Sequence, residues 1–190
     1  MTLLVPFWST LMGAILALMT FGVIVPNEDG PWETVEAVML SLTLICYLWY
    51  IVSSWNKLPK MAIPTLILFA LLIVAGLGEE TKWGIGWSVK DTYDLHQFDN
   101  VVVHALLIVY GVMLPLFAFI FFKVRYALDQ VRLPWPHLAF SPWIVLVLVS
   151  EPFLGSEARE IMLYMLFLGA VLFSTSRWRK DLHSVKDRIA

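Results

Sequence analysis

The chain has 190 residues, of which 59% are hydrophobic and 15% are charged, and its formal net charge is −2. Soluble globular domains are about 45–50% apolar and about 25% charged. This composition therefore excludes an ordinary soluble domain, a disordered chain, a coiled coil and a nucleic-acid-binding protein. The single cysteine, Cys46, excludes an internal disulfide and any paired-cysteine redox or zinc motif.

Apolar runs follow one another along the chain, and most are close to the roughly 20 residues that a helix needs to cross a hydrocarbon core of about 30 Å. Because backbone polar groups in lipid must be satisfied internally, runs of this length are predicted to be helices. The six predicted spans cover residues 3–25, 37–54, 61–78, 101–122, 137–155 and 161–176. We therefore expect an all-α, polytopic integral membrane protein in which residues 1–176 form a six-helix transmembrane domain.

The segments that connect these spans alternate in charge. The first, third and fifth carry three basic and twelve acidic residues, a formal charge of −9. The second, the fourth and the C-terminal tail carry ten basic and three acidic residues, a formal charge of +7. Since Lys and Arg favour cytoplasmic loops, we expect both termini in the cytoplasm and an acidic outer face.

Residues 177–190 are expected to form a basic amphipathic tail on the cytoplasmic side. Trp178, Leu182, Val185 and Ile189 follow a helical spacing among basic residues. This stripe predicts a short helix lying on the anionic leaflet. A frayed tail is the alternative.

Titratable side chains gather at the predicted outer ends of the third, fourth and fifth spans. Ionisable groups within a membrane are costly and usually face the protein interior or water. Since one outer loop joins the third and fourth spans, we expect Glu79 or Glu80 to approach His104. Glu151 lies deeper, in the fifth span, and could pair with Arg159 or Lys82.

These residue types suit a metal site. Imidazole together with carboxylates is a typical ligand set for Zn²⁺, Mn²⁺ or Fe²⁺. The predicted metal ligands are Glu79, Glu80, His96 and His104. Without a metal, Glu80, His104 and Glu151 are candidates for general acid–base chemistry on a lipid headgroup or an exported substrate. The alternative interpretation is solvated acids at a helix end and a hydrogen-bonded structural histidine.

One segment resembles a known group of proteins. Gly78, Glu79, Glu80, Trp83 and Gly84, followed by Leu95 and His96, resemble a Gly-Glu-Glu-x-x-Trp-Gly segment and a Leu-His element in a group of bacterial multi-pass membrane proteins. The match covers roughly residues 66–110, and where the group has Leu-His-Asn this chain has Gln97. The resemblance implies one structural unit and no particular reaction.

The expected location is therefore a membrane, specifically a bacterial inner membrane. The first functional hypothesis is an outward-facing Glu/His pocket that binds a metal and acts on a lipid-linked or exported substrate. A second is an accessory subunit of a larger membrane complex that contacts other subunits, a second copy, lipid, quinone or pigment. A third is a small-solute or cation transporter lined by Glu151.

Overall fold

The computed structural model describes residues 3–25, 31–81 and 93–186, and it describes side chains in residues 3–25, 31–78, 80–81 and 101–182. All regular structure in these ranges is helical, which confirms the all-α expectation. The helices are α1 (Leu4–Thr20), α2 (Pro31–Ser54), α3 (Ala62–Glu80), α4 (Tyr93–Ile108), α5 (Leu114–Ile120), α6 (Phe122–Gln130), α7 (Ser141–Leu154) and α8 (Ser156–Lys186). A π-helical segment, Val109–Met113, joins α4 to α5, and 3-10 turns cover Trp55–Lys57 and Leu138–Phe140.

Within the part of the chain that the structure describes, three stretches are long and apolar enough to cross a membrane: Pro31–Lys57, Val101–Ile120 and Ser156–Leu182. Three shorter apolar helices accompany them, at Leu4–Thr20, Ala62–Gly78 and Leu138–Leu154. At 1.5 Å per residue, a 17-residue helix is about 25 Å long, which is shorter than the roughly 30 Å hydrocarbon core. The structure thus supports a membrane protein with three candidate spans.

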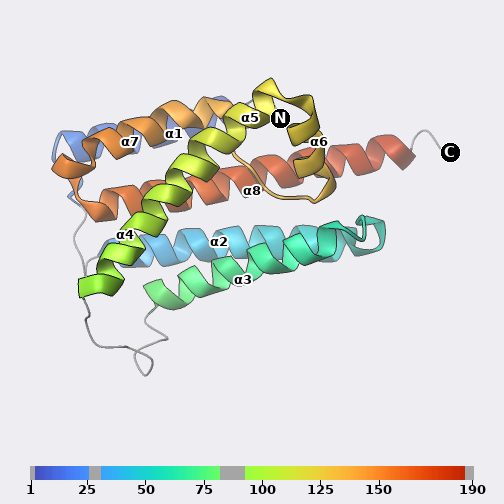
Figure 1. Ribbon diagram of the computed structural model, residues 1–190, viewed down its shortest axis with the longest axis horizontal. Helices are drawn as coiled ribbons and strands as arrows, with labels where there is room; N and C mark the ends of the chain where they lie inside the picture. The colour runs from blue at the N-terminus through green and yellow to red at the C-terminus, as the bar shows by residue number, and fades with distance from the viewer. Residues whose placement is uncertain (1–2, 26–30, 82–92, 187–190) are drawn as a thin grey trace.

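Helix α8 forms the centre of the bundle. It lies between α1 and α7 on one side and α2 and α3 on the other, while α4 and α5 cross the bundle obliquely (Figure 1). Most α8 side chains from Ala158 to Trp178 are buried. The Trp8 indole of α1 donates a hydrogen bond of 2.9 Å to the Met165 carbonyl of α8. The Cβ of an alanine at Gly169 would lie 2.3 Å from Trp8 Nε1, so this contact requires a glycine.

Helix α2 presents a polar stripe to the bundle and an apolar stripe outward. The inner stripe consists of Glu36, Leu40, Thr43, Tyr47, Tyr50 and Ser54, all buried. Val38, Leu42, Ile45, Trp49 and Val52 form the outer stripe, and all are exposed. Soluble monomers rarely expose an apolar surface this extensive, whereas lipid accommodates it. The orientation of α2 therefore supports the membrane assignment.

Several element boundaries differ from the predicted ones. Helix α1 ends at Thr20 rather than near Val25, and Gly22 continues the turn with φ +68°. Pro64 and Pro142 lie in the first turns of α3 and α7, where proline costs no helical hydrogen bond. Pro115 instead follows the π-helical segment.

The predicted tail continues α8 without a break as far as Lys186. Trp178, expected on the membrane-facing stripe, is 1% exposed and packs with its ring 5.1 Å from that of Tyr50. The separation of residues 177–190 from the transmembrane domain, and their contact with a leaflet, remain predictions.

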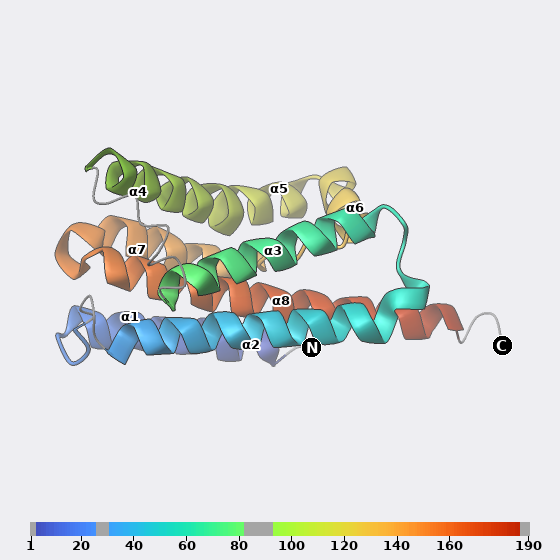
Figure 2. The ribbon, with the colours of Figure 1, turned by 90° about the horizontal axis from the view of Figure 1, so that it is seen from below.

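The two ends of the bundle carry opposite charges. The beginnings of α2 and α8 lie beside the ends of α3 and α7 (Figures 1 and 2). Helices α2, α3, α7 and α8 bring glutamates to this end. The opposite end carries Lys57, Lys123, Arg125, Arg132 and Arg177. The alternation read from the sequence therefore corresponds to a physical separation of charge.

Candidate functional site

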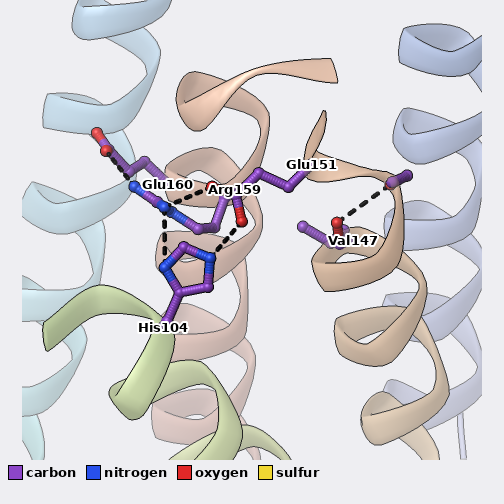
Figure 3. Close-up of polar contacts among 6 residues, drawn as sticks. His104, Val147, Glu151, Arg159 and Glu160 are labelled. Atoms are coloured by element: carbon purple, nitrogen blue, oxygen red, sulfur yellow. Dashed lines mark hydrogen bonds and ion pairs between the residues drawn. The ribbon is translucent and has the colours of Figure 1, made fainter. Parts of the chain in front are cut away.

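A fully buried arginine lies at the acidic end of the bundle. Arg159 Nη1 donates to Glu151 Oε1 at 2.7 Å, and Nη2 donates to Glu160 Oε1 at 3.4 Å (Figure 3). Nη1 also lies 3.2 Å from His104 Nδ1, and His104 Nε2 lies 2.5 Å from Glu151 Oε2. We call His104, Glu151, Arg159 and Glu160 the arginine network. It ties α4, α7 and α8 together.

The arginine determines the tautomer of His104. A guanidinium only donates hydrogen bonds, so His104 Nδ1 accepts from Arg159. The imidazole proton therefore lies on Nε2, where it is donated to Glu151. In this arrangement both ring nitrogens are engaged, Nδ1 with Arg159 and Nε2 with Glu151.

A second group of acids lies beside this network, and we call Glu36, Glu80, Glu157 and Glu160 the acidic cluster. One carboxylate oxygen from each of Glu36, Glu157 and Glu160 lies within 4.8 Å of the other two. The Tyr164 hydroxyl donates to Glu80 Oε1 at 2.5 Å, and a side-chain hydrogen bond also links Glu80 to Glu36. The cluster thus combines acids from α2, α3 and α8.

Glu36 is the most deeply buried member of the acidic cluster. Its side chain is 1% exposed, and its Oε1 has no hydrogen-bond partner among the described residues. A buried carboxylate oxygen without a partner is costly. Arg159, which forms an ion pair with Glu160 of the cluster, is shared with Glu151. The cluster therefore has a local excess of negative charge that a proton or a bound cation would offset.

The ligand chemistry of the acidic cluster differs from that expected from the sequence. The cluster offers carboxylate oxygens, which suit hard cations such as Mg²⁺, Ca²⁺ and Mn²⁺. Imidazole-containing sites are the ones that favour Zn²⁺ or Fe²⁺. The cluster therefore favours a hard divalent cation.

The predicted site residues fall into three groups. Glu80 joins the acidic cluster, whereas His104 and Glu151 join each other in the arginine network. The suggested pairing of Glu151 with Arg159 is present, while its alternative partner, Lys82, lies outside the described residues. The side chains of Glu79 and His96 also lie outside the description. The metal and catalytic roles of these residues remain predictions.

Sequence reasoning missed Glu36, Glu157 and Glu160 as site residues. Glu36 precedes the predicted second span, but it is in phase with the buried polar stripe of α2, which is a detectable signal. Glu157 and Glu160 lie three residues apart near the start of α8. The same spacing places both on one face of α8. Their proximity to α2 depends on packing between distant segments, which the sequence pattern does not reveal.

The chain matches no protein-family model, no curated protein and no solved structure.

Proposed function

We propose that this protein is a six-span membrane protein whose acidic cluster binds a divalent cation on the non-cytoplasmic side. The orientation follows from the positive end of the bundle, since basic residues favour the cytoplasm. In this arrangement α1, α3 and α7 cross as short helices, which local thinning of the bilayer accommodates at modest cost. Both termini then lie in the cytoplasm.

The buried carboxylate of Glu36 carries the proposal of a cation site. Glu36 is 1% exposed, and its Oε1 lacks a hydrogen-bond partner among the described residues. The neighbouring carboxylates of Glu157 and Glu160 supply oxygens within 4.8 Å. A cation held among these oxygens would satisfy Glu36 and offset the mutual repulsion of the acids. The hard oxygen set favours Mg²⁺, Ca²⁺ or Mn²⁺.

The arginine network supports this site from one side. Arg159 holds Glu160 and Glu151 at once, which restricts the position of Glu160 beside the cluster. His104 is itself held between Arg159 and Glu151. We assign these residues a positioning role, because such contacts orient ligands that would otherwise rotate.

The test compares Glu36→Gln with Glu33→Gln in detergent-purified protein. Both substitutions remove one acid from the start of α2, but Glu33 is not among the three acids that bring oxygens within 4.8 Å of one another. Thermal unfolding would be followed after chelation and again with added Mg²⁺, Ca²⁺ or Mn²⁺. A ligand at 100 times its Kd stabilises a protein by about 2.7 kcal/mol. We expect the added cation to stabilise both the wild type and Glu33→Gln against thermal unfolding.

Glu36→Gln should behave in the opposite way. The metal-free variant should unfold at a higher temperature than the metal-free wild type, because one buried negative charge is removed. Added cation should then have little effect. If the wild type shows no cation response at neutral pH while Glu36→Gln is still stabilised, the acids share protons instead, and the proposal is wrong.

A further inference from the structure

A cavity of about 180 Å³ lies at the basic end of the bundle, opposite the acidic cluster. It forms because the chain turns sharply at Phe121, whose backbone is extended between α5 and α6. Helix α6 thereby returns toward the end of α8 (Figure 1). The lining residues are Pro115, Ala118, Phe119, Arg125, Trp135, His137, Leu138, Phe173 and Arg177.

Two arginines supply positive charge to this cavity. Arg177 of α8 forms an ion pair with Asp129, and its guanidinium lies 5.6 Å from the centre of the Trp135 ring. Its side chain is only 15% exposed, so its position is well defined. Arg125 lies on α6, four residues before Asp129, and is exposed. With Asp129 counted against the two arginines, a formal charge of +1 remains.

His137 adds a neutral hydrogen-bond donor. Its Nδ1 accepts from the backbone N–H of Ala139 at 3.2 Å, so the proton of the neutral ring lies on Nε2. The ring packs edge-on against Phe173, with 5.4 Å between ring centres. Burial, together with the nearby Arg125, lowers the pKa of His137 below its ordinary value. The ring is therefore neutral at pH 7, and it can donate to an acceptor without adding charge.

The remaining wall of the cavity is apolar and leads to the outer surface of the bundle. Phe119 lines the cavity, is 75% exposed, and lies at the end of the candidate span Val101–Ile120. Phe122, three residues further along the chain, is 76% exposed. One side of the opening thus presents cations, and the other presents apolar rings at the edge of the membrane-spanning region.

We propose that this cavity binds the phosphodiester group of an anionic phospholipid. A phosphodiester carries one negative charge, which matches the formal charge of +1 left by Arg125, Arg177 and the Asp129 that pairs with Arg177. Arginine binds phosphate oxygens through several parallel N–H groups. Basic pockets between transmembrane helices on the cytoplasmic side are suited to anionic headgroups. The exposed rings of Phe119 and Phe122 would contact the acyl chains.

The test uses Arg125→Gln and a matched control, Lys123→Gln. Both substitutions remove one positive charge from α6, but Lys123 does not line the cavity. Detergent-purified full-length protein would be titrated with phosphatidylglycerol, and bound lipid would be counted by native mass spectrometry. Phosphatidylcholine and inorganic phosphate serve as zwitterionic and lipid-free comparisons.

We expect one tightly bound phosphatidylglycerol in the wild type and in Lys123→Gln. In Arg125→Gln, the loss of a charge-assisted contact should lower the affinity for phosphatidylglycerol about ten-fold. Phosphatidylcholine should bind more weakly, and millimolar inorganic phosphate should not displace the lipid. Equal effects of the two substitutions would indicate diffuse attraction and overturn the proposal. Displacement by inorganic phosphate would also overturn it, in favour of a soluble anion.

Discussion

Replacing Arg159 with methionine should strongly destabilise the bundle. Methionine nearly preserves the length of the apolar stem, so the main loss is the guanidinium, which is completely buried. Its removal leaves Glu151 and Glu160 without their shared cation. The side chains of these two acids are largely buried, with 19% and 24% exposed. Removing one partner of a buried ion pair typically costs about 3–5 kcal/mol. Because both carboxylates retain some access to water, we expect a loss near the lower limit, about 3 kcal/mol.

The assay is reversible unfolding in mixed micelles, followed through the fluorescence of the nine tryptophans. Lys180→Met on the same helix provides the control. Lys180 is exposed, so its replacement should change the free energy of unfolding by less than about 0.5 kcal/mol.

A double substitution separates the loss of the ion pair from the loss of packing. Adding Glu151→Gln to Arg159→Met removes one of the stranded carboxylates, so it should restore about 1 kcal/mol or more. Lower pH should restore stability to the single variant for the same reason. A loss below about 1 kcal/mol in Arg159→Met, or no recovery in the double variant, would refute this interpretation of the network.

Three further predictions follow from other parts of the structure. Gly169→Ala should lower the free energy of unfolding by about 1–3 kcal/mol, because the new Cβ would overlap the Trp8 indole ring of α1. Gly76→Ala serves as the control: its Cβ would meet a side chain at 3.6 Å, so the same unfolding assay should show almost no change. The lowered pKa of His137 favours the neutral ring in the folded state. Its contribution to stability should thus be complete above pH 6.5 and decline as the pH falls below that value, so unfolding midpoints of His137→Asn should depend less on acid than those of the wild type. In a cysteine-free background, an impermeant maleimide added to intact cells should label Thr81→Cys but not Lys60→Cys; the reverse pattern would contradict the proposed orientation.

Much of the helical architecture could be predicted because its signals are local. The apolar runs correspond to α1, α2, α3, α4 with α5, α7 and α8, although the boundaries differ by several residues. The charge of each connecting segment also predicted which helix ends lie together. The lengths of the individual helices were harder to predict, since the end of α1 depends on the turn at Gly22 rather than on hydrophobicity.

The candidate site was only partly predictable. Glu80, His104 and Glu151 were predicted as site residues because titratable groups near apolar runs are unusual; the structure places Glu80 in the acidic cluster and the other two in the arginine network. Their partners depend on contacts between distant segments, such as α2 with α8. Glu36 illustrates the limit: its phase within α2 marks it as inward-facing, but only the packed bundle places it beside Glu157 and Glu160.

The π-helical segment Val109–Met113 determines how α4 and α5, which it joins into one continuous helix, are oriented relative to each other. Its irregular turn leaves the Gly111 carbonyl to accept a hydrogen bond of 2.8 Å from the Ser141 hydroxyl, and the Tyr110 hydroxyl reaches the Pro134 carbonyl. An α-helix advances about 100° per residue, so the one additional residue of a π-turn rotates everything before it by about that angle relative to everything after it. The same helix can therefore direct His104 toward Arg159 at one end of the bundle and still present Pro115 and Ala118 to the basic cavity at the other.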